Sequence, residues 1–229
     1  PIPKGSKLRD PHSLHLTSWG TFCPTETPDG GNIGIIKHLS TTAHITFECH
    51  SEPIRKCLKQ NGLLELDQVQ HNQKYYLTRV LVNGDFMGLH KNGLYLSKKL
   101  KDLRRNAMIN IYTSISFNMI ENELNIWTDL GRCCYPVYII ENNKLLMNKE
   151  ILNKLNTTEY KWQDLITGFN ETEKVGQGEC KYISPDSTTN IIKNRAVIEY
   201  LDPEESDSCF LATRGSDLRN RQMKFTHCE

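Results

Sequence analysis

Residues 18–39 read SWGTFCPTETPDGGNIGIIKHL, a stretch too rich in proline and glycine to form a helix. Pro24 and Pro28 each fix one backbone dihedral, and the glycines supply turns in which other residues would be strained. The pattern predicts an irregular, tightly fixed loop that presents Glu26 and Asp29. The apolar run that follows predicts a strand at residues 34–39.

The whole chain has 229 residues, of which 38% are hydrophobic and 24% charged, as in a globular protein large enough to bury a core. No apolar run is long enough to span a membrane. The formal net charge of +1 gives no general reason to expect an anionic partner, so such a partner would have to be recognised by local clusters. Because the chain starts at Pro1 and ends with KFTHCE, we interpret it as a fragment of a longer protein.

Eight cysteines occur at irregular spacing and without a Cys-x-x-Cys pair. This spacing supports neither a zinc ribbon nor a thioredoxin-like motif, and it favours reduced thiols over disulfides. His12, His15 and Cys23 lack an evident fourth ligand, so a structural role is favoured over a metal site. The acidic residues at 202–207 are expected to form a solvated loop rather than a cation site.

Two helices have clear boundaries in the sequence. The first is predicted for residues 51–62, with Ser51 as N-cap, Pro53 in the first turn and Gly62 after the end. The second is predicted for about residues 94–106, with Leu96, Leu100 and Leu103 on one face. Its other faces carry five basic residues, which either form a solvated outer surface or bind an anionic partner: Lys98, Lys99, Lys101, Arg104 and Arg105. We place them on an outer surface.

Strands and turns dominate the rest of the chain. Hairpins are predicted to turn at Asn83-Gly84, near 121–122 and near 142–143, and a strand is predicted for 43–49. Further elements are predicted in the second half: helices near 158–169 and 187–195 and two strands within 196–213. The predicted class is α+β, with mostly antiparallel strands and hairpins and short helices.

Five segments, taken together, resemble the second-largest subunit of multi-subunit DNA-directed RNA polymerases, of the eukaryotic RNA polymerase II or large-DNA-virus type. They keep the family's order along nearly the whole chain: LHLTSWGTFCPTETPDGGNIGIIKHLS, VLVNGDFMGLHKN, LKDLRRNAMINIYTSISFNMIENELNIWTDLGRCCYPVYII, IEYLDPEESDSCFLA and KFTHCE. The resemblance implies a multi-domain fragment with four parts: a fork region at 1–42 rejoined by 126–141, external domains at 43–125 and 142–225, and the start of a hybrid-binding region at 226–229.

The resemblance also implies which residues lie near the active centre or nucleic acid: Arg9, His12, His15, Thr17, Trp19, Glu26, Asp29, Asn32 and Lys37. Thr226, His227 and Glu229 would begin the hybrid-binding region. Asp29 stands where the family has glutamate, and either His12 or Arg9 could pair with it. Tyr135 stands where the family has an arginine before Pro136.

The resemblance implies no catalytic residue and no metal site in this chain. Magnesium of the intact enzyme would be held chiefly by the largest subunit, and zinc by parts of the same subunit outside this fragment. The expected partners are the DNA template, the RNA–DNA hybrid, the largest subunit and other polymerase subunits, without a membrane. The expected location is intracellular: the nucleus, or a cytoplasmic viral factory or virion. The alternative is a stand-alone binding or assembly module derived from the external domains, without polymerase function.

Overall fold

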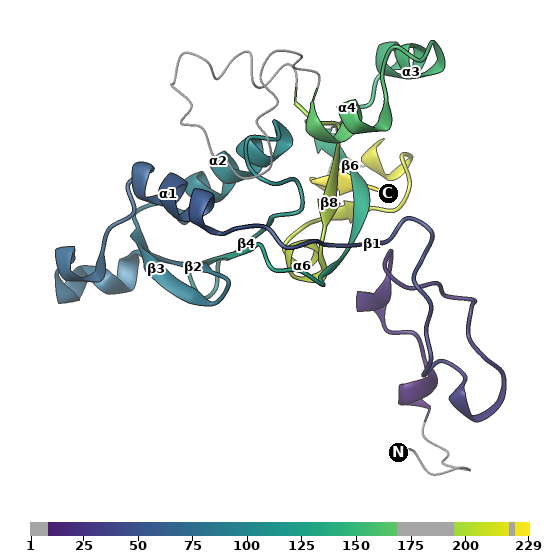
Figure 1. Ribbon diagram of the computed structural model, residues 1–229, viewed down its shortest axis with the longest axis horizontal. Helices are drawn as coiled ribbons and strands as arrows, with labels where there is room; N and C mark the ends of the chain where they lie inside the picture. The colour runs from purple at the N-terminus through teal and green to yellow at the C-terminus, as the bar shows by residue number, and fades with distance from the viewer. Residues whose placement is uncertain (1–8, 169–194, 220–222) are drawn as a thin grey trace.

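The structure is a computed structural model that describes residues 9–168, 195–219 and 223–229. Two β-sheets with short helices form the predicted α+β fold (Figure 1). The structure does not describe residues 1–8 or Cys180. The helix predicted near 187–195 also lies outside the described residues, except for Arg195. None of the described helices is long and apolar enough to cross a membrane.

The first sheet has four strands in the order β3-β2-β5-β4. Strands β2 and β5 are parallel, and the two hairpins are antiparallel. The strands are β2 (Thr78–Val82), β3 (Asp85–His90), β4 (Ser114–Asn118) and β5 (Glu123–Trp127). The predicted tight turn between β2 and β3 is confirmed, because Asn83 and Gly84 have φ angles of 52° and 81°.

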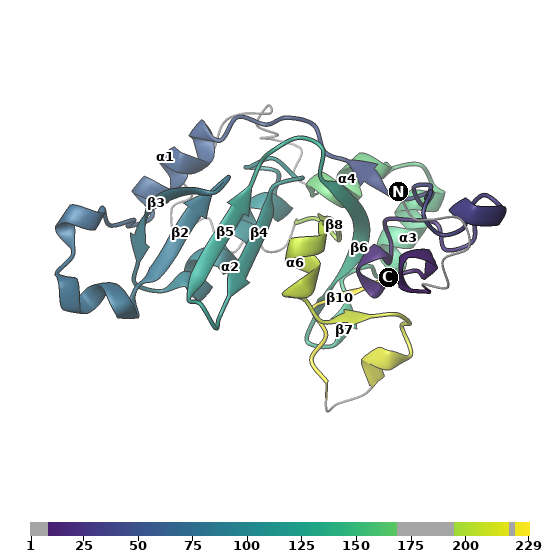
Figure 2. The ribbon, with the colours of Figure 1, turned by 90° about the horizontal axis from the view of Figure 1, so that it is seen from below.

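Helices α1 (Glu52–Gln60) and α2 (Gly93–Arg105) pack on this sheet (Figure 2). Both helices were predicted from the sequence. Helix α2 buries the predicted face of Leu96, Leu100 and Leu103, and α1 buries Ile54, Cys57 and Leu58. Ser51 stands at the N-cap of α1 as predicted, but its side chain makes no capping hydrogen bond. The hydrophobic periodicity was therefore a better guide than the capping chemistry.

The second sheet is built around the long strand β6 (Cys133–Glu141). Its path is β1-β6-β10-β9, and two further strands also pair with β6. The partners are β1 (His44–Ile45), β7 (Lys144–Leu145), β8 (Ile198–Leu201), β9 (Leu211–Ala212) and β10 (His227–Cys228). The turn predicted near 142–143 is confirmed, since Asn142 and Asn143 have φ angles of 50° and 57°.

Three short helices accompany the second sheet: α3 (Lys149–Asn156), α4 (Trp162–Thr167) and α6 (Pro203–Asp207). Helix α4 was predicted, and it buries Leu165 and Ile166, whereas Trp162 stays 53% exposed. Helix α6 contacts β4, the edge strand of the first sheet, so the two sheets meet there. This contact is where the buried charges described below lie.

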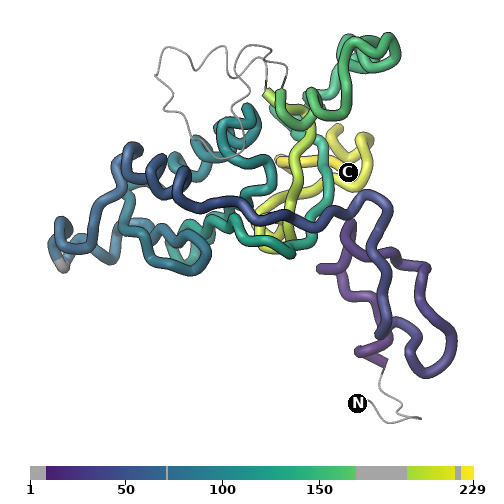
Figure 3. Tube along the Cα trace, in the orientation of Figure 1, coloured from purple at the N-terminus to yellow at the C-terminus, as the bar shows by residue number. Residues whose placement is uncertain are grey.

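Residues 9–40 extend away from both sheets, as the tube in Figure 3 shows. They contain only three short 3-10 turns: η1 (Asp10–His12), η2 (Leu16–Ser18) and η3 (Gly30–Asn32). The strand predicted at 34–39 is reduced to a single antiparallel bridge between Leu39 and Phe22. Gly34 has a φ of 73°, and the amides of Ile35 and Ile36 both donate to the carbonyl of Asn32, which closes a turn at the start of the run. The strand predicted at 43–49 is reduced to β1.

Candidate functional site

The loop formed by residues 9–40 is held by hydrogen bonds between its own distant parts. The hydroxyl of Thr27 accepts from the amide of Gly34 at 2.7 Å and donates to the carbonyl of Ile36 at 3.2 Å. His12 Nδ1 lies 2.7 Å from the carbonyl of Ile33. A Cβ added at Gly34 would lie 2.0 Å from the His12 carbonyl oxygen, so only glycine allows this approach.

The charged side chains of this loop point to solvent. Glu26, Asp29 and Lys37 are exposed, and within the described residues none of the three forms an ion pair. Asp29 precedes η3 but makes no capping hydrogen bond. The structure forms neither of the pairs considered for Asp29, because His12 bonds to Ile33 instead and Arg9 is not in an ion pair with it. The loop therefore offers unpaired charges of both signs.

Two further predicted site residues are fixed locally. His15 precedes η2, and its Nδ1 accepts from the amide of Thr17 at 3.3 Å and lies 2.8 Å from the Thr17 hydroxyl. Asn32 is exposed at the end of η3, where its carbonyl accepts the amides that close the turn. These contacts stabilise the loop backbone and leave most of the side chains accessible.

Trp19 connects the loop to the end of the chain. Its indole Nε1 donates to Glu229 Oε2 at 2.5 Å, and the ring remains 55% exposed. Next to it, Gly20 lies against the ring of Tyr135 on β6, where an added Cβ would come within 2.7 Å of the ring. The predicted site residues at the two ends of the chain are therefore in contact, although 210 positions separate them.

Thr226 and His227 place this C-terminal segment against the second sheet. The amide of Thr226 donates to the carbonyl of Phe210, and β10 pairs with β6 and β9. Thr226 is exposed, whereas His227 is only 2% exposed. His227 Nε2 contacts Glu199 Oε1 on β8. His227 therefore lies inside the molecule rather than on a surface that could touch nucleic acid directly.

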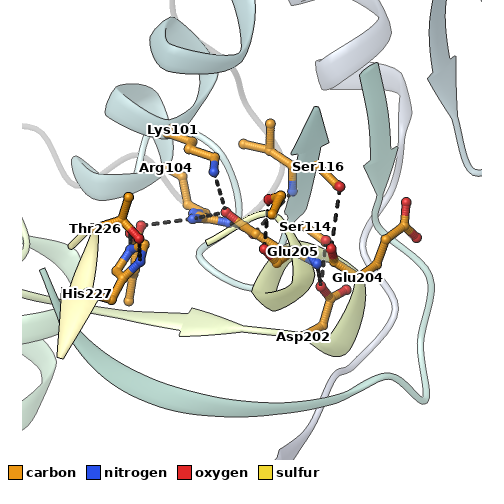
Figure 4. A network of polar contacts seen from close by, with 12 residues as sticks. Lys101, Arg104, Ser114, Ser116, Asp202, Glu204, Glu205, Thr226 and His227 are labelled. Carbon is orange, nitrogen blue, oxygen red and sulfur yellow. Dashed lines mark hydrogen bonds and ion pairs between the residues drawn. The ribbon is translucent and has the colours of Figure 1, made fainter. Parts of the chain in front are cut away.

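A buried group of charges surrounds Glu199 and Glu205 where the two sheets meet (Figure 4). Arg104 on α2 donates from Nη1 and Nη2 to the two carboxylate oxygens of Glu205 at 2.6 and 2.8 Å, and from Nη2 to Glu199 at 2.8 Å. Its Nη1 also donates to the carbonyl of Thr113 at 2.7 Å. Arg105 adds a bond to Glu199 at 2.7 Å, and Lys101 lies 3.0 Å from Glu205.

This arrangement corrects the expectation that the basic face of α2 lies on an outer surface. Arg104 is 1% exposed, and the side chain of Arg105 is 15% exposed. Lys98 alone of the five basic residues is fully on the surface. The physical reason is that two carboxylates from the second sheet compensate the charge of Arg104, so its burial is tolerated.

The acidic segment after β8 is also not the solvated loop that was expected. Asp202 is 4% exposed and Glu205 is fully buried. Asp202 accepts from the amide of Glu205 at 2.9 Å as N-cap of α6, from the hydroxyl of Ser114 at 2.8 Å and from Arg132 at 2.7 Å. Asp202 and Glu205 are therefore both bound to protein donors, whereas Asp207 is exposed, and the described residues contain no cluster suited to a metal ion.

The pKa values follow from this mutual compensation. Burial opposes the charge on Glu199, but Arg105 and Arg104 hold its pKa well below the usual value. Burial likewise opposes the charge on Glu205, whose pKa is lowered by Arg104 and Lys101. Burial also opposes protonation of His227, but its pKa is raised by hydrogen bonds with Cys209 and Glu199. Both carboxylates therefore stay ionised at neutral pH.

Sequence reasoning missed this charge group because its members are about 95–101 positions apart. The signal was present in the motif segments, since KDLRR, EYLDPEE and THCE carry the charged residues that surround Glu199 and Glu205. The described cysteines are all free thiols: Cys57, Cys134 and Cys228 are buried, and Cys23, Cys49, Cys133 and Cys209 are half-buried.

The sequence matches two family models and is similar to known proteins along its length. Residues 3–45 match the family model described as RNA polymerase Rpb2, domain 3, and residues 80–141 match RNA polymerase Rpb2, domain 4. DNA-directed RNA polymerase II subunit RPB2 of Encephalitozoon cuniculi aligns with 100% of the chain at 32% sequence identity. The RPB2 subunit of Schizosaccharomyces pombe aligns with 98% of the chain at 33% sequence identity. The chain is also 28% identical to DNA-directed RNA polymerase subunit Rpo2 of Saccharolobus shibatae. The chain spans 18% of the length of each of these relatives.

Proposed function

Because the chain belongs to the family of second-largest RNA polymerase subunits, we propose that it frames the active-centre cleft of a DNA-directed RNA polymerase, with the loop of residues 9–40 facing nucleic acid. In the intact enzyme the reaction is nucleotidyl transfer to the RNA 3′ end, and this chain supports it without supplying a catalytic group. Magnesium would be held by the largest subunit. The parent enzyme would work in the nucleus.

One observation carries this proposal. The loop exposes Glu26, Asp29 and Lys37 without ion-pair partners among the described residues, yet internal hydrogen bonds fix its backbone. A recognition loop needs accessible charges on a fixed backbone, and this loop has both. The bond from Trp19 to Glu229 holds the loop beside the segment that the family resemblance assigns to the start of the hybrid-binding region.

The external domains, residues 43–125 and 142–225, would stiffen the outer wall and contact other polymerase subunits. The stand-alone binding module remains the alternative, but the similarity to polymerase subunits is spread along the chain rather than confined to the external domains. The isolated 229-residue chain should synthesise no RNA on a primed template under either reading, so the test requires the assembled polymerase.

The test compares Asp29→Ala with Asp67→Ala in the assembled polymerase. Asp67 is a matched control, because it is an exposed aspartate in a 3-10 turn, η4 (Leu66–Gln68), and lies outside the loop of residues 9–40. Neither substitution should change the free energy of unfolding by more than about 0.5 kcal/mol. Asp29→Ala should alter elongation or misincorporation by roughly tenfold to a hundredfold, since small errors of positioning are costly in catalysis.

Asp67→Ala should leave elongation unchanged. If Asp29→Ala elongates like the unmodified enzyme, the loop does not act near the reacting nucleotides and the proposal fails. If Asp29→Ala instead lowers the melting temperature of the chain strongly, the residue is structural. A primed template with a fixed transcript length gives both the rate and the error frequency in one assay.

A further inference from the structure

A groove lies on the second sheet, beside the turn between β6 and β7 and the described residues 217–219 and 223–225. It has a volume of about 750 Å³ and is lined by residues 142–144, Leu218, Arg219, Lys224 and Phe225. The 3-10 turn η7 (Asp217–Arg219) contributes two of the lining residues, Leu218 and Arg219. None of these residues belongs to the loop of residues 9–40 or to the buried charge group.

The floor of this groove is rigid. Leu218 and Phe225 pack against a buried apolar cluster that contains Ile140, Ala212 and Cys228. The turn is fixed to the opposite wall, because Asn143 Nδ2 donates to the carbonyl of Met223 at 3.1 Å. The groove therefore has a defined shape that does not depend on a ligand.

The rim of the groove is positively charged. Lys144, Arg219 and Lys224 are all exposed, and none of them forms an ion pair with another described residue. Asp217 lies on the same turn as Arg219 and accepts from the amide of Arg214 at 3.1 Å, while Glu141 binds Arg195. The described residues that line the groove include three basic side chains and no carboxylate, so the described rim carries an excess of positive charge.

We propose that this groove binds the phosphate backbone of a single nucleic-acid strand. Lysine and arginine neutralise phosphates, the exposed amide of Asn142 adds a donor, and the half-buried ring of Phe225 gives an apolar surface for a base. The choice of nucleic acid over an acidic peptide rests on the proposed function, whereas the anionic character of the ligand rests on the charges alone. The groove would then contact the nucleic-acid strand at a second place, formed by residues that are far in sequence from the loop of residues 9–40.

The test measures binding of a fluorescent single-stranded oligonucleotide to the 229-residue chain by anisotropy, between 50 and 200 mM salt. The groove variant combines Lys144→Gln, Arg219→Gln and Lys224→Gln. The control combines Lys56→Gln, Lys59→Gln and Lys98→Gln, which removes the same charge from exposed positions on α1 and α2. Melting temperatures of both variants establish that the fold is retained, since none of these six side chains is buried.

The groove variant loses three phosphate contacts. A plot of the logarithm of its association constant against the logarithm of the salt concentration should therefore be shallower by about 2. Its binding should be roughly a hundredfold weaker near 0.1 M salt. The control variant should bind like the unmodified chain. Equal losses in the two variants would mean a non-specific charge effect and overturn the proposal, as would absence of binding at 50 mM salt. If polyglutamate competes as well as an oligonucleotide of equal charge, the ligand is an acidic peptide instead. Elongation by Asp29→Ala tests the loop separately, so failure of one proposal is distinguishable from failure of the other.

Discussion

Replacement of Arg104 by methionine tests whether the buried charge group holds the two sheets together. Methionine keeps much of the side-chain length and removes four bonds at once: two to Glu205, one to Glu199 and one to the carbonyl of Thr113. The two carboxylates stay behind in an environment from which water is excluded, because Glu199 is 3% exposed and Glu205 is 0% exposed. The substitution therefore leaves buried charge with less compensation.

The expected cost follows from the partners that remain. Removing one member of a buried ion pair typically costs about 3–5 kcal/mol, because the other charge is left uncompensated. Here Arg105 still binds Glu199 at 2.7 Å, and Lys101 still lies 3.0 Å from Glu205. We therefore expect a loss near the lower end, about 3 kcal/mol. For a chain of this size this corresponds to a drop in melting temperature of about 6–12 °C.

Arg55→Met is the matched control, because Arg55 lies on α1 and pairs with Asp85 at 2.6 Å at the surface. The side chains of this pair are 28% and 68% exposed, so its loss should cost only about 0–1 kcal/mol. Urea unfolding followed by circular dichroism gives the free energy for each variant, and calorimetry gives the melting temperature. A cost for Arg104→Met that equals that of Arg55→Met would refute the reasoning.

The double variant Arg104→Met/Glu205→Met separates lost attraction from uncompensated charge. If the unpaired carboxylate causes most of the damage, removing Glu205 as well should leave the chain no less stable than Arg104→Met alone. The amide of Ile115, which donates to Glu205 at 3.2 Å, loses its acceptor in this variant, and this limits the recovery. Strictly additive costs would mean that the two residues act independently, contrary to the bidentate geometry.

Folding raises the pKa of His227, so the stabilisation from its protonated form is complete below about pH 6.5. This stabilisation is lost as the pH rises through the folded-state pKa. The melting temperature should therefore fall as the pH is raised from 6 to 9, and it should fall less steeply in His227→Asn. Gly34→Ala should lower the melting temperature or loosen the loop to proteolysis, because the new Cβ meets the His12 carbonyl, whereas Gly31→Ala has open space and should be tolerated. Cys23 should react first with iodoacetamide, since hydrogen bonds with Thr25 lower its pKa. Cys134 should react last, since burial raises its pKa to about 12. Mass spectrometry of the partly alkylated chain gives the order of reaction.

Local patterns in the sequence predicted the elements that local chemistry determines. The turn at Asn83-Gly84 and the buried face of α2 at Leu96, Leu100 and Leu103 were predicted because each depends on neighbours a few residues away. Of the strand predicted at 34–39 only a bridge between Leu39 and Phe22 forms, since Gly34 turns the chain and keeps the start of the apolar run out of the pairing. Pairing between β6 and its partners depends on distant residues and could not be read from the pattern.

The candidate site shows the same division. The exposed acids Glu26 and Asp29 were assigned from a rigid loop motif, and the structure does place them on a fixed backbone in solvent. Charge alone could not tell that Arg104 is buried while Lys98 is exposed, because burial of an arginine depends on carboxylates that arrive from other elements. Net charge counts every basic residue equally, whereas the fold distinguishes them by their partners.

The buried charges add directional contacts where the two sheets meet. Leucine or methionine at the same positions would bury more apolar surface, but hydrophobic contact is not directional. Arg104 instead fixes α2 to α6 and β8 through a planar fork, and Glu199 extends the contact to His227 on β10. Two residues further on, Glu229 accepts the bond from Trp19, so a series of directional bonds connects Arg104 with the loop. Together with the contact of Gly20 against Tyr135, this bond anchors a loop that must present its charges at a fixed place and whose own short turns do not define where it lies.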